Sequence, residues 1–152
     1  MKPARILRLA AVFAAVQYIA HAILFLSATP KHGAEEVAVI DAMKAHRFEF
    51  SGFSRSYWNF YFGYGLLGIL WGVVEVVLLW QLAKLAEADP RQVRPTIGLL
   101  VAANAAHALL TGTYFFPAPV IFDVLVAATL VWSYFASRTH NASGAIVGGA
   151  GR

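Results

Sequence analysis

Several side chains that could do chemistry interrupt the long apolar stretches of this 152-residue sequence. Gln17 and His21 are four residues apart in one stretch, so a helix would place them on one face. Asn104, His107 and Thr111 form a similar stripe in another stretch, at spacings of three and four residues. Polar groups inside an apolar segment are costly unless they face one another, so both stripes are functional candidates.

His21, His107 and Asp123 are expected to lie at similar depths below the outer surface of a membrane. With a helical rise of about 1.5 Å per residue, counting from the outer ends of the predicted helices places them roughly 7 to 12 Å deep. The histidines could be hydrogen-bonded packing groups, or they could exchange protons with a ligand while Asp123 orients a ring. A third interpretation is that His21 and His107 are axial ligands of a haem or another metal ion. A zinc signature of the HExxH type is absent from the sequence.

Glu75 is expected deeper in the membrane, below a neutral layer formed by Gln17 and Asn104. Gly68 and Gly72 precede Glu75 by seven and three residues, so all three share one side of a helix. Small residues four apart let helices approach closely, which could bury Glu75 or join two copies of the chain. Glu75 therefore has two interpretations: a protonated carboxyl that only hydrogen-bonds another helix, or a group for proton handling or ligand binding.

The elements that must position these groups are four apolar stretches of nearly membrane-spanning length. Of the residues in the chain, 59% are hydrophobic and 13% are charged, whereas about 25% are charged in a typical soluble protein. Lipid is therefore the expected solvent. The spans are predicted at residues 6–26, 58–82, 96–116 and 120–136. The predicted fold is all-α: an antiparallel four-helix transmembrane bundle over residues 1–137, followed by a flexible tail over residues 138–152.

The basic residues indicate how the spans are oriented. Placing the N-terminus in the cytoplasm puts most of them inside, as the positive-inside rule requires. The inside group is Lys2, Arg5, Arg8, Lys84, Arg91, Arg94, Arg138 and Arg152, and the outside group is Lys31, Lys44, Arg47 and Arg55. We expect a multi-pass protein of the bacterial inner membrane with both termini cytoplasmic. The net charge of +4 comes without any run of Lys or Arg, which argues against nucleic-acid binding, and the lack of Cys excludes thiolate chemistry.

The start of the chain has one feature of a secretory signal, because Lys2, Arg5 and Arg8 precede an apolar run. That run is longer than the core of a usual signal, and Gln17 and His21 interrupt it. We therefore expect the segment to stay in place as the first transmembrane helix.

The connection over residues 29–57 is the only long one between the predicted spans. Val37, Ile40 and Met43 recur at helical spacing within it, which predicts a short helix lying on the outer membrane surface. Aromatic residues then gather over residues 48–64. They form either an interfacial belt that anchors the second span or the wall of a lipid-facing pocket.

A polar segment opens the second predicted span, where Arg55, Trp58 and Asn59 are candidate ligand contacts. Arg55 could cover an anionic headgroup or pair with Asp123, while Asn59 would face the opening. The alternative is an arginine that only extends to the interface beside an aromatic belt.

In these features the sequence resembles a group of small bacterial membrane proteins with four helices. The resemblance rests on the first span with His21, on Pro30, His32 and Gly33 in the outer connection, and on the run RSYWNFYFGYG over residues 55–65. It covers roughly residues 12–132 and implies a four-helix membrane fold without implying an activity. A looser similarity to DoxX-like proteins concerns size and topology only.

Three functions are consistent with these observations. The leading hypothesis is a protein that binds a lipid-like or quinone-like molecule in a cavity opening to the outer leaflet. Its polar contacts would come from His21, His107, Asp123 and Arg55, with Glu75 and Asn104 below them. The alternatives are an intramembrane isomerase or redox enzyme, and a structural or assembly subunit whose polar groups lock the packing.

Overall fold

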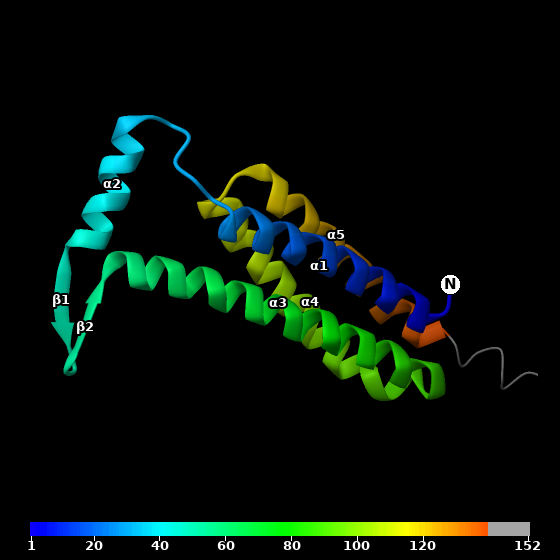
Figure 1. The fold of residues 1–152 in the computed structure, drawn as a ribbon. Coiled ribbons are helices and arrows are strands. Elements are labelled where there is room, and N and C mark those ends of the chain that lie inside the picture. Colours follow the sequence, from blue (N-terminus) through cyan, green and yellow to red (C-terminus); the bar gives the residue numbers. More distant parts are fainter. Residues whose placement is uncertain (140–152) are drawn as a thin grey trace, which may run out of the picture. The chain divides into compact units, whose positions relative to one another are not determined.

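In the computed structural model of the protein, residues 1–139 are described. Five helices and a two-stranded sheet follow one another along the chain (Figure 1). In order they are α1 (Pro3–Leu26), α2 (Ala34–Ala45), β1 (Arg47–Phe50), β2 (Phe53–Ser56), α3 (Tyr57–Ala88), α4 (Pro90–Tyr114) and α5 (Pro117–Thr139). Helices α1, α3, α4 and α5 are long and apolar enough to cross a membrane, which confirms the number of predicted spans.

Local signals account for the ends of the long helices. Helix α3 continues to Ala88, beyond the predicted end of the second span, because the added residues are mostly strong helix formers. Asp89 then caps α4, since its side chain accepts a hydrogen bond from the backbone N–H of Arg91 and Pro90 occupies the first helical turn. Helix α5 includes Arg138, which was predicted to belong to the tail, and the remainder of the predicted tail, residues 140–152, lies outside the described residues.

The chain divides into two compact units, and the division falls within α1 and α3. Unit 1 comprises Met1–Gln17 and the chain from Val73 onward, and unit 2 comprises Tyr18–Gly72. All of the fully buried apolar side chains among the described residues belong to unit 1. They are Ala4, Ile6, Leu7, Ala10, Ala11, Ala14, Leu79, Leu82, Ala83, Ala86, Val93, Ile97, Val126 and Leu130. The many alanines among them allow helices to approach closely, and α4 and α5 lie side by side (Figure 1).

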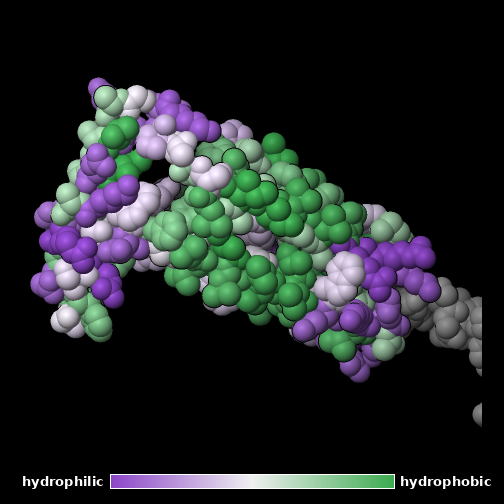
Figure 2. All heavy atoms as spheres, in the orientation of Figure 1, coloured by the Kyte–Doolittle hydropathy of each residue, from purple (hydrophilic) through white to green (hydrophobic). Residues whose placement is uncertain are grey.

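The outer surfaces of the long helices carry large apolar side chains. Leu24, Trp71 and Leu109 are 65%, 66% and 72% exposed, respectively, and many others resemble them. Figure 2 shows hydrophobic residues across the middle of these helices, while hydrophilic residues gather over α2 and the adjacent hairpin on the left and again on the right of the view. An apolar surface this extensive needs lipid or a partner to cover it, which fits four membrane-spanning helices.

Among the described residues, the one departure from the all-α prediction lies in unit 2. Strands β1 and β2 pair antiparallel, with Arg47 opposite Ser56 and Phe50 opposite Phe53. Ser51 and Gly52 connect them with φ angles of 50° and 79°. Two consecutive positive φ angles are what a tight two-residue hairpin turn requires, so the turn sets the register of the strands. Helix α2, which precedes the hairpin, occupies the segment that was predicted to be helical.

Glycines bring α1 and α3 close together within unit 2. A Cβ atom added at Gly72 would lie 2.1 Å from Cγ of Tyr18, and one at Gly65 would lie 2.0 Å from Cζ of Phe25. A Cβ at Gly68 would meet only Nε2 of His21, at an ordinary contact distance of 3.5 Å. The glycines thus have a packing role inside one chain, and association of two chains through Gly68 and Gly72 stays a prediction.

Candidate functional site

Three polar side chains from three helices meet in unit 1. We call Gln17 of α1, His107 of α4 and Asp123 of α5 the Asp123 cluster. Nε2 of Gln17 donates a hydrogen bond to Oδ1 of Asp123, and Nδ1 of His107 lies 3.2 Å from the same oxygen. Asp123 is only 1% exposed. A buried carboxyl is therefore held by an amide on one side and an imidazole on the other.

The second oxygen of Asp123 is not used by this network. Oδ2 is buried and has no hydrogen-bond partner among residues 1–139. Thr111, one helical turn after His107, is also buried, and its hydroxyl neighbours the Asp123 carboxyl. A buried oxygen without a partner costs free energy, and a hydroxyl from water or from a ligand would remove that cost.

His107 connects the buried carboxyl to the outside of unit 1. Its side chain is 48% exposed, whereas that of Asp123 is 2% exposed. When the Nδ1–H of neutral His107 donates to Asp123, the lone pair of the ring is on Nε2. That atom can accept a hydrogen bond from a hydroxyl or ligate a metal, and a carboxylate behind the ring strengthens either interaction. Among the described residues, no group of three or more His, Asp and Glu side chains could hold a metal ion.

A second polar contact in unit 1 joins α4 to α3. Nδ2 of Asn104 donates to Oε1 of Glu75 at 2.8 Å and to the carbonyl oxygen of Leu100 at 3.0 Å. Asn104 is buried and Glu75 is half-buried. Each of the two amides donates to a different carboxyl group, Gln17 to Asp123 and Asn104 to Glu75. This pairing satisfies an acceptor oxygen of both carboxyls inside the spans. The neutral layer expected from Gln17 and Asn104 stays a prediction.

His21 belongs to unit 2, although its helix also carries Gln17. Its ring stacks on Phe25, with the centroids 5.8 Å apart and the planes 11° from parallel. Phe25 also packs against Tyr61 and Phe62. The described contacts of His21 are therefore those of an aromatic cluster, and a role for it in ligation stays a prediction.

The polar segment before α3 has local partners within unit 2. Ser56 and Asn59 form a reciprocal cap, in which the backbone N–H of each residue donates to the side-chain oxygen of the other. Arg55 donates to the carbonyl oxygen of Ser54 and lies over the ring of Phe53 at 5.2 Å. Nζ of Lys44 lies 4.8 Å from the centre of the Trp58 ring. These contacts begin α3 and tie it to α2, and they leave ligand binding by Arg55, Trp58 and Asn59 as a prediction.

Sequence reasoning missed two pockets on the α4–α5 pair. One has a volume of about 500 Å³ and is almost wholly apolar; it is lined by Gly112, Phe115, Pro117, Val120, Ile121, Val124 and Leu125. The other lies at the opposite end of the two helices and is basic. Arg94 and Arg138, which line it, had been interpreted only as charges that set the orientation. Their convergence depends on how two helices pack, which no local sequence pattern reveals.

Comparison of the chain with models of protein families, with curated proteins and with solved structures gives no match. The residues and contacts of the chain itself indicate where a functional site lies. Among these, the Asp123 cluster combines a buried carboxyl with an accessible partner, which makes it the leading candidate for a functional site.

Proposed function

We propose that this protein binds the polar group of a lipid-like or quinone-like molecule at the Asp123 cluster, inside a bacterial inner membrane. One observation carries the proposal: a buried Asp123 carboxyl holds His107, whose ring is half exposed. If His107 only stabilised the packing of the helices, its imidazole ring would not need to be half exposed. A ligand hydroxyl or carbonyl needs an oriented partner, and His107 is suited to provide it.

The proposal includes an antiparallel four-helix bundle with both termini in the cytoplasm and α2 on the outer membrane surface. Four helices of membrane-spanning length support the bundle. The distribution of Lys and Arg supports the orientation. Helix α2 has no buried residue and carries both apolar and charged side chains, as a helix lying at a membrane surface does.

The rest of the ligand would be apolar. The pocket of about 500 Å³ on α4 and α5 offers almost entirely apolar walls. Two of its residues, Gly112 and Val124, adjoin Thr111 and Asp123 in the sequence. A molecule with a hydroxyl or carbonyl head and a hydrocarbon tail matches a polar cluster next to an apolar pocket.

Binding of a decyl-substituted benzoquinone and its reduced quinol tests the proposal. The protein is reconstituted in lipid nanodiscs, and quenching of its tryptophan fluorescence is titrated for the wild type, His107→Ala and His32→Ala. His32 lies in the exposed loop before α2, so its variant controls for the loss of a histidine. Loss of one hydrogen bond from an oriented imidazole should weaken quinol binding about tenfold in His107→Ala. His32→Ala should bind as the wild type does.

The same titration can contradict the proposal. If His107→Ala binds the quinol as tightly as His32→Ala, the Asp123 cluster does not contact the ligand. If His107→Ala also lowers the thermal stability while binding is unchanged, the cluster has only a packing role. Circular dichroism of each variant separates that outcome from a loss of fold.

A further inference from the structure

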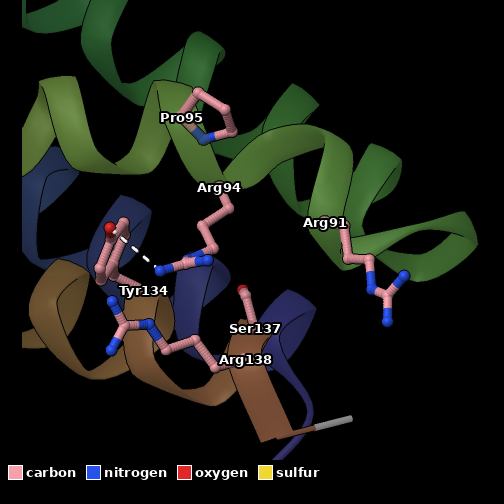
Figure 3. A pocket seen from close by; sticks show the side chains of 6 residues that line it. All are labelled: Arg91, Arg94, Pro95, Tyr134, Ser137 and Arg138. Atoms are coloured by element: carbon pink, nitrogen blue, oxygen red, sulfur yellow. Dashed lines mark hydrogen bonds between the residues drawn. The ribbon is translucent and has the colours of Figure 1, made fainter. Parts of the chain in front are cut away.

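A basic pocket lies where α4 begins and α5 ends, both in unit 1 (Figure 3). Its volume is about 740 Å³, and its lining residues are Arg91, Arg94, Pro95, Tyr134, Ser137 and Arg138. Three of these six residues are arginines, and no carboxylate from the described part of the chain lines the pocket. The pocket is therefore positively charged at any physiological pH, because arginine does not lose its proton in proteins.

Two of the arginines converge on one aromatic ring. The guanidinium carbon of Arg94 lies 4.5 Å from the centre of the Tyr134 ring, and that of Arg138 lies 5.5 Å from it. Nη2 of Arg94 also donates a hydrogen bond to the Tyr134 hydroxyl oxygen at 3.2 Å. Figure 3 shows both side chains directed toward Tyr134, while Arg91 turns outward at the rim. The hydroxyl hydrogen of Tyr134 remains able to donate to another group.

No acidic side chain of the described residues neutralises the positive charges of the pocket. Within residues 1–139, no ion pair involves Arg91, Arg94 or Arg138. The two acids just before α4 are already engaged: Glu87 pairs with Arg8, and Asp89 accepts the backbone N–H of Arg91. Nε of Arg94 is buried and has no hydrogen-bond partner in that part of the chain. Two guanidinium groups drawn together without a counter-charge are stabilised when an anion binds between them.

We propose that this pocket binds the phosphate of an anionic lipid headgroup. Guanidinium forks match phosphate oxygens, and Tyr134 can add a further hydrogen bond. The pocket lies at the ends of two membrane-length helices, which is the depth at which headgroups lie. Phe135 is exposed beside Arg138, whose guanidinium carbon is 5.3 Å from its ring, so an apolar surface for an acyl chain adjoins the basic one. The site is separate from the Asp123 cluster, and each can be present without the other.

Lipid binding by protein in a neutral detergent tests this proposal. Native mass spectrometry measures adducts with dioleoyl phosphatidylglycerol, with dioleoyl phosphatidylcholine and with inorganic phosphate. The variant is Arg94→Gln/Arg138→Gln. Its matched control is Arg5→Gln/Lys84→Gln, which removes two exposed positive charges outside the pocket.

The wild type should bind phosphatidylglycerol in preference to phosphatidylcholine. Each basic side chain near an anionic lipid contributes about a factor of five in affinity, so the pocket variant should bind phosphatidylglycerol about twentyfivefold more weakly. The control variant should keep the affinity of the wild type. If the pocket variant does not fold, Arg138→Gln alone in the last turn of α5 should weaken binding about fivefold.

Three results would overturn the proposal. The wild type could show no preference between the two lipids. The two double variants could lose the same affinity, which would mean that total charge and not the pocket attracts the lipid. An excess of inorganic phosphate could displace phosphatidylglycerol completely, which would identify a soluble phosphate and not a lipid as the ligand.

Discussion

The two units of the chain hold their helices together by different interactions. In unit 1, aliphatic side chains form a buried core, and Gln17, Asn104 and their carboxyl partners are hydrogen-bonded across helices. In unit 2, only Ser56 and Gly72 are fully buried, and the main contacts are between aromatic rings and between rings and glycines. Unit 1 therefore defines the positions of individual polar atoms, whereas unit 2 defines how closely two helices approach.

This difference indicates where a specific site can form. Hydrogen bonds depend on distance and direction, so the polar groups of unit 1 are held in one arrangement. Ring contacts tolerate a wider range of distances and angles. Substitutions should accordingly act on the two units in different ways: steric changes should matter most in unit 2, and changes of single polar atoms should matter most in unit 1.

Gly72→Ala should have the largest effect on stability. The new Cβ would lie 2.1 Å from Cγ of Tyr18, which is bonded directly to Cβ, so only a change of the χ1 angle or a shift of the helix can relieve the clash. We expect the free energy of unfolding to fall by about 3 kcal/mol, as in other overpacked interiors. Unfolding in mixed detergent micelles measures this.

Gly68→Ala is the control for that substitution. Its Cβ would meet only Nε2 of His21 at 3.5 Å, so the variant should be within about 1 kcal/mol of the wild type. Equal stability of the two alanine variants would show that α1 and α3 do not approach closely at Gly72.

Asp123→Ala should have an intermediate effect. It removes the acceptor of both Gln17 and His107, and interhelical hydrogen bonds in membranes contribute at most about 1.7 kcal/mol each. A loss of about 1.5 kcal/mol in the free energy of unfolding is expected. Asp41→Ala, at an exposed position on α2, should change little. The same small change at Asp123 would mean that its hydrogen bonds do not stabilise unit 1.

Ser56→Ala should cost about 1 kcal/mol, because the Ser56 hydroxyl accepts the backbone N–H of Asn59 at the start of α3. The loss should be local. Hydrogen exchange should accelerate in the first turn of α3 and stay unchanged in α4. Uniform acceleration in both helices would contradict a capping role.

Glu36 gives the smallest and most local effect, and it depends on pH. Its carboxylate accepts hydrogen bonds from the backbone N–H groups of His32 and Lys31, which lower the pKa of Glu36. Because the folded-state pKa is lowered, this stabilisation is present at neutral pH and is lost as the pH falls through the folded-state value. Amide exchange at Lys31 and His32 should accelerate over that acidic range.

Glu36→Gln should show faster exchange of these two amides already at neutral pH. Glu35→Gln removes the same charge from the neighbouring exposed position, and its profile should match the wild type. Identical exchange profiles in the two variants would show that the Glu36 carboxylate does not protect the amides of Lys31 and His32.

Length and hydropathy were sufficient to predict the four long helices, because a bilayer imposes both. The β1–β2 hairpin was missed because its aromatic residues also suit an interfacial belt. The pair Ser51-Gly52 between Phe50 and Phe53 was the available signal, since glycine favours the positive φ that a tight turn needs.

The polar sites were predictable only as separate residues. Helical rise placed His107 and Asp123 at similar depths, and the two are in contact. Gln17 and Asp123 are 106 positions apart in the sequence, and their hydrogen bond depends on how each helix is rotated about its axis. Arg94 and Tyr134, 40 positions apart, meet for the same reason. Rotation follows from the packing of whole helices, which the spacing of polar residues along one helix does not determine.

Native mass spectrometry of the protein gently extracted from its own membrane tests the Asp123 cluster most directly. The wild type should retain a lipid-like or quinone-like molecule of defined mass. His107→Ala should lose this molecule, while Ser56→Ala, a variant destabilised elsewhere, should keep it. A wild type that carries no such molecule, or a His107→Ala protein that retains it to the same extent, would contradict ligand binding at this site.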